Sequence, residues 1–374
     1  MLEIYLPIVQ VNIDIFLLLF LSLVVGILSG LFGVGGGFLM TPFLIFMGIP
    51  PVYAVPNEVN NILATSVSGS LTHWFKDTLD YRMGLMIVAG GVAGTLLGIS
   101  TFSYFEGIGK ISLIISLLYM YLLAIVGTLM LIEVFRVATQ KKTTKKKLHD
   151  HNWLQGLPLR MRFQKSRLYE SALTPILLGL IVGFVAAMMG IGGAFLMVPA
   201  MIYIVGMPVK LIPGTSLFVT IFISAIVTVL HAFNYGSIDL YLVFPLILGS
   251  IVGVQLGQKV GQFLDSTELK SLFAMLLLCV AVAIGYDSFF RDKATSFNGS
   301  KIIKTDLSAF AEFTIKMSDE LPILYGAFSI ILAISLGVLA AAGRKFVSPI
   351  ARKLLSEYKR KDTKKKEEDK FPEK

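Results

Sequence analysis

The residues best suited to chemistry in this sequence are glycines, which form two matching clusters inside apolar segments. The clusters and the residues that follow them read Gly33-Val34-Gly35-Gly36-Gly37-Phe38-Leu39-Met40-Thr41-Pro42 and Gly190-Ile191-Gly192-Gly193-Ala194-Phe195-Leu196-Met197-Val198-Pro199. Glycine costs a helix about 1 kcal/mol relative to alanine, so each cluster predicts a break and a new helix from Gly37 or Ala194. A helix N-terminus, with its unpaired N–H groups, favours an anion. The alternative interpretation is close helix packing through small residues.

Short polar side chains follow each break and could donate hydrogen bonds to an oxyanion. The candidates for substrate binding are Asn57, Asn61 and Thr65 in the first half, and Thr215 and Ser216 in the second. Asn61 and Thr65 are one helical turn apart and therefore share a face. Uncharged donors of this kind bind an oxyanion and still release it. Hydrogen bonding between helices would explain the same residues equally well.

Three titratable side chains are candidates for proton coupling. Glu58 follows the first break, and a buried carboxyl can carry a proton, although this residue would also suit the outer interface. His73 and His231 occupy matching positions near the ends of two apolar segments, and histidine titrates near neutral pH. An interfacial histidine copied by duplication is the plainer explanation. Asp80 and Asp239 each precede an apolar segment and predict helix N-caps.

The composition indicates a polytopic membrane protein. Of 374 residues, 55% are hydrophobic and only 15% are charged, well below the roughly 25% of soluble domains. The basic residues behind the net charge of +9 concentrate in 136–168 and 344–374. Because these segments flank membrane spans, they favour a lipid bilayer rather than nucleic acid as the partner. The single Cys279 excludes an intramolecular disulfide.

The sequence contains no motif for a nucleotide, a cofactor or a metal ion. A phosphate-binding loop requires a lysine after its last glycine, and neither glycine cluster has one. No pairing of a nucleophile with a base is visible, so an enzyme is not expected. No pattern points to an oligomeric state.

Apolar segments divide the chain into two membrane repeats, at 1–135 and 172–290. Their members lie at 12–32, 37–50, 57–75, 83–104 and 110–135, and at 172–190, 194–206, 211–232, 240–260 and 270–290. A basic cytoplasmic linker is expected at 136–171, an extracytoplasmic loop at 291–320, a last transmembrane span at 321–343 and a charged cytoplasmic tail at 344–374. The predicted fold is an all-α polytopic membrane protein.

The two repeats match residue by residue. Gly90, Gly94 and Gly98 correspond to Gly249, Gly253 and Gly257, and the offset between halves stays between 157 and 159. Five segments per repeat imply opposite, inverted topologies. The distribution of Lys and Arg places the N-terminus outside and the C-terminus in the cytoplasm. Segments 37–50 and 194–206 are shorter than the roughly 20 residues of a full span, so they are either tilted spans or parts of re-entrant hairpins.

A Gly-x-Gly-Gly motif with a following proline, present in both halves and followed by a Gly-x-Pro turn, resembles the sulfite exporter TauE/SafE family. The second half also carries Gly214-Thr215-Ser216 after its turn, whereas the first reads Pro56-Asn57-Glu58. The resemblance covers nearly the whole chain. It implies a transporter of small sulfur-containing anions such as sulfite and organosulfonates.

These patterns together predict a secondary transporter in the cell membrane. Paired breaks in two inverted halves favour alternating access around an anion held near the midplane. An inside-negative potential favours anion export, by about 2.3 kcal/mol per charge at 100 mV, and H⁺ is the expected coupling ion for import. The alternatives are an anion channel, and a membrane sensor or scaffold that signals through the basic linker and tail.

Overall fold

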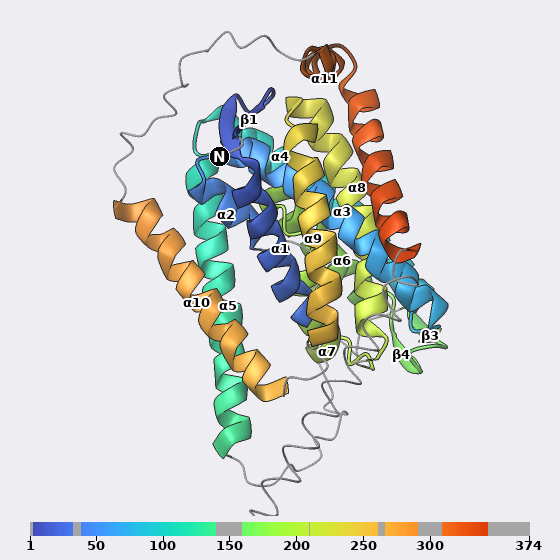
Figure 1. Ribbon diagram of the computed structural model, residues 1–374. Coiled ribbons are helices and arrows are strands. Elements are labelled where there is room, and N and C mark those ends of the chain that lie inside the picture. The colour runs from blue at the N-terminus through green and yellow to red at the C-terminus, as the bar shows by residue number, and fades with distance from the viewer. Residues whose placement is uncertain are drawn as a thin grey trace, which may run out of the picture.

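The structure, a computed structural model, is a bundle of helices (Figure 1) and describes residues 3–32, 39–139, 159–208, 210–260, 266–290 and 309–342. The helices are α1 (Ile15–Phe32), α2 (Met40–Phe46), α3 (Pro51–Phe75), α4 (Tyr81–Gly107), α5 (Ile111–Thr139), α6 (Leu173–Met189), α7 (Ala194–Tyr203), α8 (Ile212–Tyr235), α9 (Leu240–Val260), α10 (Ser266–Phe290), α11 (Ala309–Glu320) and a last helix, Pro322–Ala342. Apart from α11, they follow the predicted apolar segments.

Two short β-hairpins depart from the all-helical expectation. Strands β1 (Glu3–Leu6) and β2 (Val11–Asp14) pair before α1, and β3 (Arg160–Phe163) and β4 (Leu168–Ser171) pair before α6. The end of the expected linker at 136–171 is therefore folded. Strands of four residues have too little apolar periodicity to reveal themselves in the sequence, and an isolated two-stranded hairpin is marginally stable. Contacts with the bundle must hold both hairpins.

Glycines allow two pairs of helices to pack with almost no space between their backbones. Helix α9 lies along α1, where a Cβ on Gly253 would stand 2.3 Å from the carbonyl oxygen of Leu23. Helix α4 lies along α6, where a Cβ on Gly94 would stand 2.0 Å from the carbonyl oxygen of Leu180. Small residues permit such close approach in membranes. Each pair thus joins one helix of the first half to one of the second.

Helices α2 and α7, which follow the two breaks, are too short to cross a membrane. They have seven and ten residues, or about 10 and 15 Å at 1.5 Å per residue, against a hydrocarbon core of about 30 Å. Met197 and Met201 of α7 share a hydrophobic cluster with Phe163 of β3, and that hairpin leads directly into α6. The α6–α7 pair therefore turns back toward the end at which it began (Figure 1).

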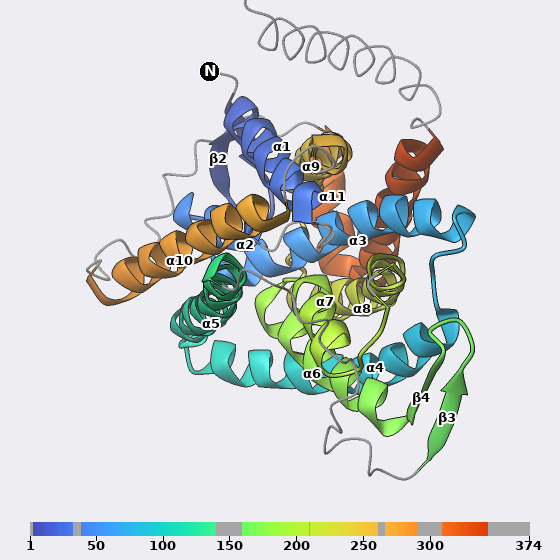
Figure 2. The ribbon, with the colours of Figure 1, turned by 90° about the horizontal axis from the view of Figure 1, so that it is seen from below.

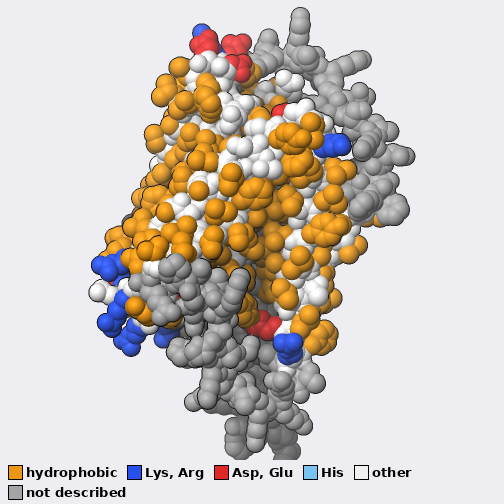
Figure 3. Space-filling view, turned by 180° about the vertical axis from the view of Figure 1, so that it is seen from behind, with side chains coloured by type: hydrophobic (Ala, Val, Ile, Leu, Met, Phe, Trp, Pro, Cys, Tyr) orange, Lys and Arg blue, Asp and Glu red, His pale blue; other side chains and the backbone are white. Residues whose placement is uncertain are grey.

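The outer surface of the bundle is apolar, as expected for contact with lipid. Five helices are long and apolar enough to span a membrane, at Tyr81–Gly107, Ile111–Arg136, Ile212–Tyr235, Leu240–Val260 and Pro322–Ala342. Large apolar side chains such as Leu129, Val282 and Ile331 point outward from helices. Figure 3 shows a broad hydrophobic face with Lys and Arg gathered toward one end. The chain is thus a multi-pass membrane protein.

Helix α3 runs through the centre of the bundle although it is among its most polar helices. Figure 2 shows it between the α1–α9 pair and the α4–α6 pair. Every residue from Ala54 to Ser70 is buried. Burying polar groups is costly unless they are hydrogen-bonded, and polar groups inside a membrane often mark a functional site. The candidate site therefore lies on α3.

Candidate functional site

A buried polar cluster lies on one face of α3, where it meets α9. The side-chain amide nitrogen of Asn61 is 3.3 and 3.2 Å from the two carboxylate oxygens of Glu58, and 3.0 Å from Oγ of Ser250 on α9. Thr65 continues the same face one turn further along, and its hydroxyl donates to the carbonyl oxygen of Ile62 at 3.0 Å. Glu58 and Asn61 are fully buried and Thr65 is 2% exposed. The sequence-predicted residues Glu58, Asn61 and Thr65 therefore lie together on one buried face of α3.

The Glu58 carboxyl has no buried cation to pair with in the part of the chain that the structure describes. No Lys or Arg in those ranges is buried. The hydroxyl of Tyr119, on α5, lies within electrostatic range of Glu58 and donates to the carbonyl oxygen of Met189 at 2.6 Å. Tyr119 therefore joins the cluster to the end of α6, where the second break begins.

The second glycine break packs directly on α3. Gly190, Gly192 and Gly193 have φ values of 74, 66 and 81°. These values lie in the left-handed region, which glycine adopts readily because it has no Cβ. A Cβ on Gly192 would stand 2.4 Å from Cγ2 of Ile62. Ala194 then begins α7, and its N-cap Gly193 supplies no side-chain hydrogen bond. The first N–H groups of α7 are thus buried without a capping side chain.

Several predicted residues lie elsewhere. The first break lies outside the described residues, and with it the predicted Gly33, Gly35, Gly36 and Gly37. Pro42 is buried in α2 and lines a small cavity with Tyr119. Pro199 lies inside α7 and is half-buried. Pro42 and Pro199 shape the short helices and offer no donor.

A small cavity lies between the halves, alongside α3. Its volume is about 20 Å³, and it is lined by Ser29, Thr65, Gly69, His73, Pro213, Leu217, Val254 and Gln258. A cavity of that size holds about one water molecule. Because Thr65 and His73 both line it, the cavity connects the polar cluster with the end of α3.

Comparison with known proteins places this sequence in a family. The model of the sulfite exporter TauE/SafE family matches residues 18–284. The chain belongs to this family. It is 29% identical to the probable membrane transporter protein YjnA of Bacillus subtilis, over 70% of this chain and 96% of that protein. It is 27% identical to the probable membrane transporter protein MJ0441 of Methanocaldococcus jannaschii, over 70% of this chain and 91% of that protein. No solved structure matches.

In this TauE/SafE protein, Asn57 and Thr215 hold helix ends of the opposite half. The N–H of Asp239 donates to Oδ1 of Asn57 at 2.7 Å, and the N–H of Asp80 donates to Oγ1 of Thr215 at 3.0 Å. The hydroxyl of Ser216 donates to the carbonyl oxygen of Pro213 at 3.1 Å. Hydrogen bonding between helices, the second interpretation of these residues, is thus present at Asn57 and Thr215.

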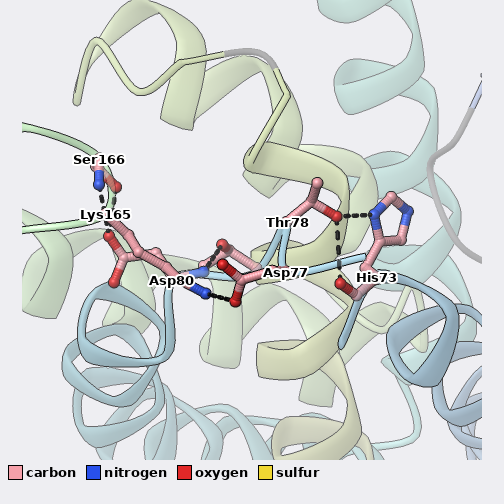
Figure 4. Close-up of polar contacts among 7 residues, drawn as sticks. His73, Asp77, Thr78, Asp80, Lys165 and Ser166 are labelled. Atoms are coloured by element: carbon pink, nitrogen blue, oxygen red, sulfur yellow. Dashed lines mark hydrogen bonds and ion pairs between the residues drawn. The ribbon is translucent and has the colours of Figure 1, made fainter. Parts of the chain in front are cut away.

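The two aspartates are N-caps, as the sequence predicts, and they also anchor the hairpins. Asp80 accepts from the N–H of Met83 at 3.2 Å and from the N–H and hydroxyl of Ser166 (Figure 4). Asp239 accepts from the N–H of Tyr241 at 3.0 Å and of Ile8 at 2.9 Å. Burial raises the pKa of the Asp239 carboxyl, and its N–H donors oppose that rise.

The two histidines match in sequence but differ in surroundings. His231 is fully buried, with Nε2 3.0 Å from the carbonyl oxygen of Ala187 and its ring edge-on to Phe102. It therefore supports the end of α6. His73 is half-buried, with Nδ1 2.8 Å from Oγ1 of Thr78 (Figure 4). Of the two, only His73 lines the cavity.

Sequence reasoning missed three residues of the site, namely Ser29, Tyr119 and Ser250. Ser250 had a signal, because it directly follows Gly249 where the matching residue of the first half is Gly91. A lone hydroxyl that replaces a glycine in a packed seam needs a partner, and Asn61 supplies it. Ser29 and Tyr119 stand in ordinary apolar runs, so only their contacts reveal them.

Proposed function

We propose that this chain is a secondary transporter that exports small sulfur-containing anions, sulfite or an organosulfonate, by alternating access. The observation that carries the proposal is the buried cluster of Asn61, Thr65 and Ser250 beside the Gly190–Gly193 break. Amide and hydroxyl groups solvate an oxyanion without binding it too tightly for release. The family's name supplies the substrate class.

The proposed architecture is a pair of inverted repeats, followed by α11 and the last helix. In support, α1 packs on α9 as α6 packs on α4, and the glycines of both seams correspond. The hairpins begin at Glu3 and Arg160 and end at Asp14 and Ser171, at one constant separation. In this reading the breaks belong to re-entrant hairpins that enter from opposite faces. The inverted arrangement gives alternating access a structural basis.

The proposed orientation follows from the basic residues. Lys76, Arg82, Lys165 and Lys210 lie at or beside the end of the bundle that carries the β3–β4 hairpin, and basic residues favour the cytoplasmic side. The cavity beside His73 is then at the cytoplasmic end of α3. The N-terminal hairpin lies on the outer side. An anion would enter the cavity from the cytoplasm and leave past the outer half of α3.

The test is flux through the full-length protein in proteoliposomes, with sulfite, methanesulfonate, sulfate and acetate as probes. Saturable flux of sulfite or methanesulfonate, at least tenfold above acetate, is expected. Asn61→Leu should reduce this flux at least tenfold. Asn234→Leu is the matched control, because Asn234 is exposed on α8, and it should stay within twofold. Equal flux of all four anions would contradict the substrate class, and unsaturable flux at channel rates would indicate a channel.

A further inference from the structure

The two halves place chemically different side chains at corresponding buried positions. The first-half site has a hydroxyl or an amide at every one of five positions around α3, whereas the second-half counterparts around α8 are small or apolar. The pairs are Ser22 and Gly179, Ser29 and Ala186, Asn61 and Val219, Thr65 and Ile223, and Ser250 and Gly91.

Apolar side chains occupy the second-half counterpart of the site. The Cδ1 atom of Ile223 lies 2.7 Å from the position that a Cβ on Gly91 would take. Val219 and Ile223 belong to one hydrophobic cluster with Ile87 and Val182. These apolar side chains offer an anion no hydrogen-bond donor. Among the described residues, the polar members of the five pairs therefore lie on the side of α1, α3 and α9.

The carboxylate of Glu58 holds the donor that an anion would need. The side-chain amide of Asn61 is its hydrogen-bond donor, at 3.2 to 3.3 Å. The corresponding residue of the second half is the neutral Ser216. Glu58 is fully buried, and no Lys or Arg in the described ranges is buried to pair with it. Two anions cannot share one uncharged amide in a low-dielectric site without strong repulsion.

Within the described residues, the surroundings of Glu58 offer no other group to take up the charge. The titratable group within electrostatic range of it on a neighbouring element is Tyr119 of α5. Tyrosine is not a cation at neutral pH. One buried oxygen nearby, Oδ1 of Asn61, has no hydrogen-bond partner within the described residues. A protonated Glu58 could donate to such an acceptor.

We infer that Glu58 is a built-in competitor for the anion, so that each chain takes up one proton at Glu58 when it binds one anion. This inference rests on the proposed function and specifies its site. A solvent proton forms an O–H bond on Glu58, the carboxylate leaves the amide of Asn61, and the anion takes its place. The expected stoichiometry is one, because the five counterpart positions carry no amide and no hydroxyl.

The test is calorimetric binding of methanesulfonate to the full-length protein in detergent. Methanesulfonate stays ionised across the pH range, so any proton taken up belongs to the protein. Titrations in imidazole and in Tris, two cationic buffers that differ in ionisation enthalpy and do not compete as oxyanions, give the protons taken up per anion. At the pH values at which Glu58 of the empty protein is ionised, the expected value is about one and the affinity rises about tenfold per unit fall in pH; once Glu58 is protonated before the anion binds, both effects disappear. Glu58→Gln should reduce the uptake to zero and remove the pH dependence.

The matched control is Glu106→Gln, because Glu106 is an exposed carboxyl at the end of α4, and it should behave as the wild type. Binding without proton uptake, uptake that persists in Glu58→Gln, or two anions per chain would each overturn the inference while leaving the transporter proposal standing. If Glu58→Gln does not fold, the wild-type measurement in two buffers still decides. If neither methanesulfonate nor sulfite binds at any pH, the proposed function fails and this inference fails with it.

Discussion

Asn57 accepts a hydrogen bond from the N–H of Asp239 at 2.7 Å, so a central side chain of one half fixes the start of a helix in the other. The corresponding bond, from Asp80 to Thr215, runs in the opposite direction between the halves. Each aspartate in turn anchors a hairpin. The halves are therefore interlocked at both ends of the bundle, and the middle of α3 is left for the site.

Removing one of these anchors should destabilise the fold. Asp239→Ala removes the acceptor for Ile8 and Tyr241 and leaves their N–H groups without it. A lost cap and a lost buried bond to a charged group together cost about 2–4 kcal/mol. Thermal unfolding of the detergent-solubilised protein, followed by fluorescence, measures this. Asp77→Ala is the control, because Asp77 is exposed and pairs only with Lys165 within the described residues. It should cost less than about 1 kcal/mol, and an equal loss would contradict the anchoring role.

The sequence predicts the helices and the Asp80 and Asp239 caps, because each depends on a local pattern, whereas the glycine seams between the halves come from the structure. It does not predict how Asn57 and Thr215 are used, since helical spacing shows which residues share a face and not what lies opposite. The one-sided site was partly visible: Asn61 and Val219 correspond in sequence. Only the packing of Ile223 on Gly91 shows that an apolar side chain occupies the place in the second half that corresponds to Thr65.

Substitutions in the second break should separate backbone strain from packing against α3. Gly192→Ala suffers both, because φ is 66° and the new Cβ would stand 2.4 Å from Ile62. Gly206→Ala suffers strain alone, since φ is 68° and nothing lies within 4 Å of the new Cβ. Gly206→Ala should cost about 1–2 kcal/mol and keep flux. Gly192→Ala should cost more and reduce methanesulfonate flux at least tenfold.

A second substitution tests whether the clash with Ile62 causes the loss of flux in Gly192→Ala. Combining Gly192→Ala with Ile62→Ala should recover part of the lost flux, because the Cγ2 atom that meets the new methyl group is removed. The double-mutant cycle should then give a coupling energy larger than the deviation from additivity of about 0.5 kcal/mol that independent sites show. Additive effects would mean that the break and α3 act independently.

The asymmetry between the halves predicts different responses to small substitutions at corresponding positions. Thr65→Val keeps the shape and removes the hydroxyl that lines the cavity, so flux should fall about tenfold, while the lost hydrogen bond to Ile62 should cost about 0.5–1.5 kcal/mol of stability. Ile223→Val removes one methylene from the corresponding place and should cost about 0.5–1.5 kcal/mol with flux within twofold. Proteoliposome flux and thermal unfolding of both variants provide the check. Equal losses of flux would mean that both copies of the site work.

The orientation can be tested with single cysteines in a Cys279→Ser background. Cys279 is itself exposed on α10 and must be removed first. Lys165 lies in the hairpin at the basic end, and Lys316 lies in α11 at the opposite end (Figure 1). A membrane-impermeant maleimide should label Lys316→Cys in intact cells and Lys165→Cys only after lysis. The reverse pattern would place the cavity beside His73 on the outer side of the membrane. The inside-negative potential would there oppose movement of an anion from the cavity toward the cytoplasm. Export through this site would then need a different entrance.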